Sequence, residues 1–186
     1  AVSDQVRALL TPHGVDVCSV DLPHYEGASA VLHLMSVLSP IAHDKAVVYE
    51  PLAPVRLLQF LESRGLSNIW LLGWSFGTEL ALKYGYDKNV RGAILLSPPL
   101  HRTSEDELRN WNGTNKPVIA IVPEFDDYLV PEAAEKRFEP LEGAQIVAID
   151  GAKHLWVGES ATKSVIDEVV RVVAPEFYPL PTHYRG

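Results

Sequence analysis

The chain has 186 residues, of which 47% are hydrophobic, and its formal net charge at pH 7 is −8. This length and composition suit a single domain over residues 1–186 with a two-sided core. An acidic surface repels phosphate groups, so we expect a small-molecule partner rather than a nucleic acid. No apolar run approaches the roughly eighteen residues of a membrane span. With a single cysteine, Cys18, no disulfide can form within the chain, and we expect a cytoplasmic protein.

In chain order, the first predicted elements are a helix over residues 2–10 and a strand over residues 15–20. Residues 30–42 form a short apolar segment broken by Pro40, in which we expect a small helix. That helix either packs into the body of the domain or covers an active site, so residues 24–50 are a candidate lid or connecting segment. A further helix is predicted over residues 54–62, ending before Gly65.

A glycine-flanked serine follows the next predicted strand, over residues 69–72. The segment reads Gly73-Trp74-Ser75-Phe76-Gly77 and opens a helix over residues 78–84. A G-x-S-x-G sequence between a strand and a helix is typical of a nucleophile elbow, in which a tight turn exposes the serine hydroxyl above the sheet. The glycines keep side chains from colliding where strand and helix approach each other. We therefore predict that Ser75 is a nucleophile; an ordinary strand-to-helix turn is the alternative.

The rest of the chain alternates strands and helices. Strands are predicted over residues 90–97, 118–122 and 145–150, and helices over residues 104–111, 131–138 and 162–173. The first of these helices starts with a capping-box pattern, Ser104 to Glu107. Such alternation predicts an α/β fold with a mostly parallel sheet and helices on both faces.

Acidic residues and a histidine follow two of these strands. The strand over residues 118–122 leads to Asp126 and Asp127, and the strand over residues 145–150 leads to His154. A serine hydroxyl is a weak nucleophile, so it requires a histidine base and a carboxylate that orients the histidine. The chain order Ser, acid, His is the order found with a nucleophile elbow. Both loops also follow the carboxyl ends of strands, where open α/β sheets bind ligands.

These residues resemble an α/β-hydrolase, and in particular the small carboxylesterases and dienelactone hydrolases. In that family the acid comes from an Asp-x-x-Val-Pro pattern, which Asp127 fits and Asp126 does not. The resemblance thus implies a triad in which Ser75 is the nucleophile, His154 the general base and acid, and Asp127 the orienting carboxylate. It also implies that the backbone N–H of Phe76 is one donor of an oxyanion hole. We expect neither a metal nor another cofactor.

The resemblance further implies strands that this chain lacks at its N-terminal side. In the family one of them lies between the strand at residues 15–20 and the elbow strand, and its loop supplies the second oxyanion donor. We therefore expect the N-terminal strands to be missing, with a gap in the sheet. Trp74, Tyr128 and Trp156 lie near the triad in sequence and are candidate substrate-binding surfaces, although packing is the alternative for each.

The expected function is a serine hydrolase that cleaves a carboxylic ester or thioester of a small molecule through an acyl-enzyme. Amidases, perhydrolases and carbon–carbon hydrolases use the same three residues, so the substrate stays open, as does the oligomeric state. The competing class is a noncatalytic ligand-binding or interaction protein that keeps the scaffold, because a fold does not determine a function.

Overall fold

The computed structural model describes residues 15–20, 35–40, 46–48, 63, 69–86 and 89–179. Seven strands form one sheet, in which the spatial order from β1 to β7 follows the chain order. The first three strands are β1 (Val15–Val20), β2 (Met35–Pro40) and β3 (Ala46–Val48). β2 is antiparallel to both of its neighbours, whereas β3 runs parallel to β4 (Ile69–Trp74).

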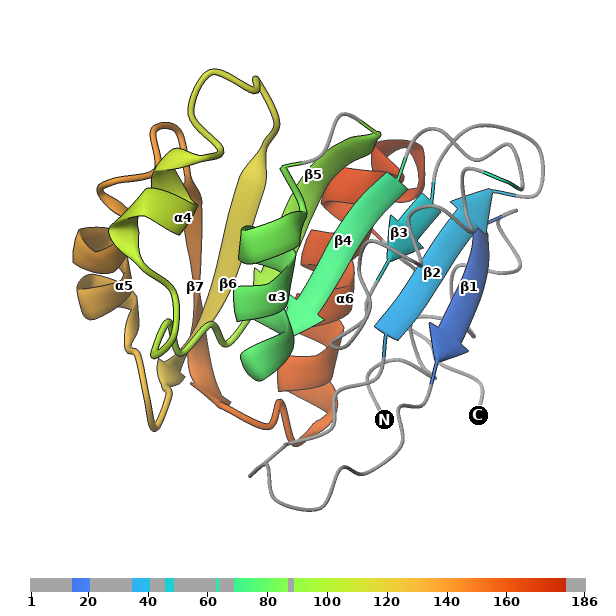
Figure 1. Ribbon diagram of the computed structural model, residues 1–186. Coiled ribbons are helices and arrows are strands. Elements are labelled where there is room, and N and C mark those ends of the chain that lie inside the picture. The colour runs from blue at the N-terminus through green and yellow to red at the C-terminus, as the bar shows by residue number, and fades with distance from the viewer. Residues whose placement is uncertain are drawn as a thin grey trace, which may run out of the picture.

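The parallel part of the sheet continues from β4 to β7, with helices between the strands. Its strands are β5 (Val90–Leu96), β6 (Val118–Phe125) and β7 (Gln145–Lys153). The helices are α3 (Phe76–Tyr84), α4 (Glu105–Arg109), α5 (Pro131–Phe138) and α6 (Glu159–Val173), followed by the 3₁₀ turn η2 (Pro175–Phe177). α3 lies in front of β4 and β5, and α6 lies behind the sheet (Figure 1). The predicted parallel sheet with helices on both faces is confirmed.

The core lies between the sheet and these helices. The central strands β4, β5 and β6 are buried along nearly their whole length, as strands covered on both faces should be. α6 supplies one apolar face, whose buried positions recur at helical spacing: Val165, Ile166, Val169, Val170 and Val173. This rigid centre holds the carboxyl ends of the parallel strands at one edge of the sheet.

Residues 35–40 form a strand, not the small helix that we expected over residues 30–42. All six residues of β2 are in register with β1, and a short apolar run does not by itself distinguish a strand from a helix. Whether residues 24–50 act as a lid or a connection stays a prediction, because much of that segment lies outside the described residues. The helices predicted over residues 2–10 and 54–62 also lie outside them.

No gap separates β1 from the elbow strand β4. β2 and β3 occupy that place, so the described sheet is continuous. The expected gap came from the family resemblance, and the antiparallel pairing of β2 with β1 and with β3 fills it. In the described part of the chain, none of the helices combines the length and the apolar character needed to cross a bilayer.

Candidate active site

Ser75 stands on a strained turn between β4 and α3. Its φ of 50° and ψ of −122° lie in a region that residues with side chains rarely adopt, at a cost of about 1–3 kcal/mol. Hydrogen bonds hold the turn: the Ser75 N–H donates to the Leu96 carbonyl at 2.8 Å, and the Ser75 carbonyl accepts from the Thr78 N–H at 2.9 Å. The Thr78 hydroxyl donates to the same carbonyl at 2.6 Å. The predicted elbow geometry is therefore present.

Gly73 allows the strand and the helix to meet so closely. A Cβ atom at this position would lie 2.7 Å from the Gly77 carbonyl oxygen and 2.7 Å from Thr78 Cα. Both neighbours are backbone atoms at the start of α3, so they cannot shift without distorting the backbone of the elbow. The first glycine of the motif is thus required by packing.

Three buried side chains form a hydrogen-bonded chain that ends on the serine. His154 Nε2 lies 2.9 Å from Ser75 Oγ, and His154 Nδ1 lies 3.0 Å from Asp126 Oδ2. A carboxylate can only accept, so Nδ1 carries the proton, and in the neutral ring Nε2 is left as an acceptor for the Ser75 hydroxyl. His154 and Asp126 have side chains that are only 8% and 1% exposed. The arrangement holds a base against the nucleophile.

Asp126, not Asp127, is the residue that orients His154. Asp126 is buried, whereas Asp127 is exposed. The second carboxylate oxygen of Asp126, Oδ1, accepts from the N–H of Tyr128 at 2.8 Å and of Leu129 at 3.2 Å. One carboxylate thus closes the turn after β6 and holds the histidine. The assignment of Asp127 from the Asp-x-x-Val-Pro pattern was wrong by one residue.

The surroundings of Asp126 keep its carboxylate ionised. Burial favours the neutral acid and on its own would raise the pKa of Asp126. The hydrogen bond from His154, the N–H groups of Tyr128 and Leu129 and the charge of the imidazolium outweigh that effect, so the pKa lies below its ordinary value of 3.8. A negative charge therefore faces His154 Nδ1 at neutral pH.

Solved structures share this architecture at low sequence identity. An esterase domain of a Rhodothermus marinus protein superposes with a TM-score of 0.58 at 13% identity, over 83% of this chain and 96% of that one. A protein of Bacillus subtilis assigned as a hydrolase gives 0.53 at 12% identity, over 91% and 95% of the two chains. An α/β serine hydrolase homologue of Coxiella burnetii gives 0.50 at 24% identity, over 64% and 56%. The chain has the α/β-hydrolase fold.

At these identities the likeness concerns the fold alone. The chain spans 56% of the length of the Coxiella protein. No protein-family model and no curated protein matches the sequence. The functional assignment therefore rests on the residues of the site.

Within the α/β-hydrolase fold, two further side chains fix the loop that carries His154. The His154 carbonyl accepts from Trp74 Nε1 at 3.1 Å and from Ser97 Oγ at 3.2 Å. Trp74 is the last residue of β4 and Ser97 directly follows β5, so both lie where neighbouring strands end beside the elbow. Trp74 was expected to contact substrate; its indole N–H binds the histidine loop, and its contact with substrate stays a prediction. Sequence reasoning missed Ser97, although its place after a strand next to β4 was a usable signal.

The other two aromatic candidates differ. Tyr128 is 55% exposed, and its ring meets the His154 ring edge-on, with centroids 4.8 Å apart. It therefore stands at the histidine, and its contact with substrate stays a prediction. Trp156 is only 2% exposed and belongs to the core, which corrects its assignment to a binding surface. Its indole stays out of water because burying so large an apolar ring is favourable.

The role of Phe76 as an oxyanion donor stays a prediction. Phe76 is the first residue of α3, and the N–H groups of a first helical turn have no partner within the helix. They also carry the positive end of the helix dipole. A second oxyanion donor is not assigned among the described residues. No group of three or more His, Cys, Asp or Glu side chains in the described ranges could hold a metal ion.

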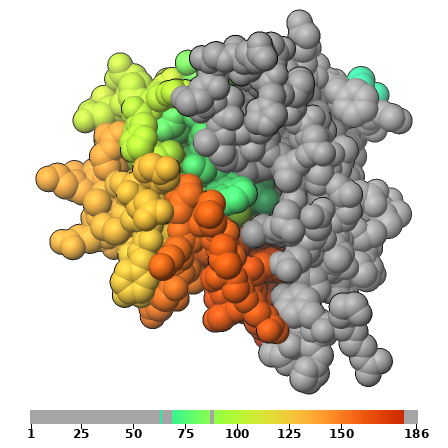
Figure 2. Space-filling model, turned by 90° about the horizontal axis from the view of Figure 1, so that it is seen from below, coloured from blue at the N-terminus to red at the C-terminus, as the bar shows by residue number. Residues whose placement is uncertain are grey.

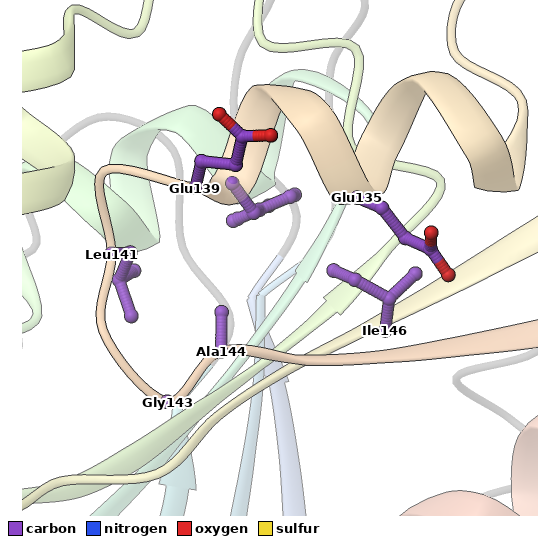
Figure 3. Close-up of a pocket in the computed structure, with 7 residues that line it drawn as sticks. Glu135, Glu139, Leu141, Gly143, Ala144 and Ile146 are labelled. Atoms are coloured by element: carbon purple, nitrogen blue, oxygen red, sulfur yellow. The ribbon is translucent and has the colours of Figure 1, made fainter.

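The view from below looks onto the carboxyl ends of the parallel strands, where green atoms at the start of α3 lie beside orange atoms of the segment after β7 (Figure 2). A separate hollow of about 300 Å³ lies between α5 and the beginning of β7 (Figure 3). Because His154 follows the end of β7, this hollow is at the opposite end of that strand and is not the active site. It is lined by Glu135, Phe138, Glu139, Leu141, Gly143, Ala144 and Ile146.

Proposed function

We propose that the protein is a serine hydrolase that cleaves a carboxylic ester or thioester of a small molecule through an acyl-enzyme. The observation that carries this proposal is the buried hydrogen-bonded chain from Asp126 through His154 to Ser75. The strained backbone of Ser75 supports it, because such strain persists where a function requires it. The fold shared with an esterase domain supports it as well.

Acylation follows from the direction of the hydrogen bonds. Ser75 Oγ attacks the acyl carbonyl carbon while His154 Nε2 takes the hydroxyl proton. The imidazolium that forms keeps its other proton on Nδ1, where the Asp126 carboxylate stabilises it. The Phe76 N–H faces the negative charge that develops on the carbonyl oxygen. Nε2 then returns its proton to the departing alkoxide or thiolate, leaving the acyl group on Ser75.

Deacylation repeats these steps with water. A water molecule gives a proton to His154 Nε2 and attacks the acyl carbon, and the ester bond to Ser75 Oγ breaks. Nε2 protonates Ser75 Oγ, which restores the starting hydrogen bonds and releases the acid. A general base of this kind contributes about 10²–10⁴ in rate, and an oxyanion donor about 10²–10³. Esters and thioesters suit these groups, because an alkoxide or thiolate leaving group needs no assistance beyond the single proton that His154 Nε2 can return to it.

Covalent labelling with a fluorophosphonate tests the proposal without a known substrate. The full-length protein is incubated with the probe and the labelled peptide is mapped by mass spectrometry, for the wild type and for Ser75→Ala. Ser164→Ala is a matched control, because this half-buried serine of α6 binds only the Ser160 carbonyl among described residues. We expect labelling at Ser75 in the wild type and in the control, and none in Ser75→Ala. A folded protein that is not labelled would favour a noncatalytic binding protein.

A further inference from the structure

The loop after β5, residues 97–103, borders the proposed active site on two sides. The ring of His101 meets the ring of Tyr128 edge-on, with centroids 5.4 Å apart, and Tyr128 in turn contacts His154. On the other side the guanidinium of Arg102 lies over the ring of Phe76, 5.3 Å from its centroid. The loop thus reaches both the residue beside the base and the residue that follows the nucleophile.

Two side chains from other elements fix this loop. Glu79, which is 5% exposed and lies one turn after Ser75 in α3, accepts a hydrogen bond from the Arg102 N–H at 3.0 Å. Arg137 of α5 donates to the carbonyls of Leu100 at 2.9 Å and Thr103 at 3.4 Å. Because these contacts hold the backbone on both sides of residue 102 and at that residue itself, the Arg102 side chain starts from a defined place beside the elbow.

The charge of Arg102 is not neutralised by the described part of the protein. Arg109 pairs with Glu105 and Asp106, and Arg171 pairs with Glu168. No described carboxylate forms an ion pair with the exposed guanidinium of Arg102; the carboxylate of Glu79 binds the Arg102 backbone instead. In a chain of net charge −8, a cation left without an acidic partner beside the elbow is available to a ligand.

We propose that Arg102, with His101 beside it, binds an oxoanion group of the substrate, so that the preferred esters or thioesters carry a carboxylate or phosphate. A guanidinium presents parallel N–H donors that match the two oxygens of such a group. The ring of His101 adds a further N–H donor on the same loop. This inference rests on the proposed hydrolase function and names its substrate class.

The test compares substrates that differ in one charged group. The first pair is a 4-nitrophenyl monoester of a dicarboxylic acid and the ester of the matching monocarboxylic acid. The second pair is two thioesters whose leaving thiols end in a carboxylate or in a hydroxyl. The ratio of kcat/KM within each pair is measured for the wild type, Arg102→Gln and Arg102→Lys. Arg91→Gln is the matched control, since this exposed arginine lies at the start of β5, away from the elbow.

We expect the wild type and Arg91→Gln to prefer the anionic member of at least one pair by about 10-fold or more, the scale of one charge-assisted hydrogen bond. Arg102→Gln should reduce this ratio to near one, and Arg102→Lys should keep part of it. Higher ionic strength should weaken the preference. The preference should appear in KM more than in kcat, because the contact is made in the bound substrate as well as in the transition state.

Fluorophosphonate labelling of the same samples separates the two proposals. Labelling at Ser75 without an anionic preference in either pair, or a preference that Arg102→Gln retains, overturns the role of Arg102 and leaves the hydrolase function standing. A folded wild type without labelling at Ser75 and without turnover overturns the hydrolase function, and the inference with it.

Discussion

Replacing Asp126 by asparagine should remove most of the reactivity of Ser75. The Asp126 carboxylate accepts from two backbone N–H groups through Oδ1 and from His154 Nδ1 through Oδ2. In Asp126→Asn the amide oxygen can replace Oδ1, which turns the NH₂ group toward Nδ1. The imidazole must then accept at Nδ1 and carry its proton on Nε2. That tautomer cannot take the proton from the serine hydroxyl.

The loss should reach about 10³–10⁴ in rate, because the corresponding change in a Ser-His-Asp triad costs about 10⁴ by reversing the histidine tautomer. The assay is the pseudo-first-order rate of fluorophosphonate labelling at Ser75, followed by intact mass. Circular dichroism checks that Asp126→Asn remains folded, since the amide keeps the two turn hydrogen bonds.

Asp127→Asn is the matched control for this prediction. Asp127 is exposed and makes no contact with His154 among the described residues. Substitutions of exposed residues that lie outside a buried hydrogen-bond network usually have small effects. The labelling rate of Asp127→Asn should therefore stay within about two-fold of the wild-type rate. Equal losses in the two variants, or a larger loss in Asp127→Asn, would refute the hydrogen-bond reasoning and restore the assignment from the sequence pattern.

Three further predictions concern stability. Gly73→Ala places a Cβ 2.7 Å from two backbone atoms, so urea denaturation should show a loss of about 1–3 kcal/mol; an unchanged midpoint would contradict the close approach. Ser75→Gly relieves the positive φ of 50° and should raise the free energy of unfolding by about 1 kcal/mol while abolishing labelling; a less stable variant would argue against strain. The pKa of Asp126 is lowered in the folded protein, so its ionised carboxylate contributes stability at pH values above its ordinary pKa of 3.8. That contribution is lost as the pH falls through the pKa of Asp126 in the folded protein. The stability difference between the wild type and Asp126→Asn should therefore be constant near neutral pH and shrink only below about 3.8; shrinkage at pH 5 to 6 would contradict the lowered pKa.

The nucleophile and the base could be predicted because their signals are local. Gly73 and Gly77 around Ser75 describe a backbone that only small residues permit, and His154 directly follows the strand β7. Parallel strands bring such loops to one edge of the sheet whatever the details of packing. The strands β4 to β7 and the helices α3 to α6 could be predicted from the sequence, because apolar runs alternate there with segments of helical spacing; the short parallel strand β3 was not predicted.

The acid could not be chosen by pattern alone, because neighbouring residues of an extended chain point to opposite sides. Asp126 and Asp127 differ by one position, and only the turn that brings the N–H groups of Tyr128 and Leu129 to Oδ1 selects the first. Trp156 shows a related limit, since nearness to His154 in sequence does not tell a ring at the surface from a ring in the core. The strand at residues 35–40 depended on pairing with β1, which a short apolar run does not reveal.

Trapping the acyl-enzyme tests the central claim most directly. The protein is mixed with an activated ester, quenched in acid at short times and digested, and the acylated peptide is identified by mass spectrometry. The proposed mechanism predicts an acyl group on Ser75 that disappears as substrate is exhausted, with no turnover in Ser75→Ala. Turnover that persists in Ser75→Ala, or an acyl group on another residue while Ser75 stays unmodified, would contradict it.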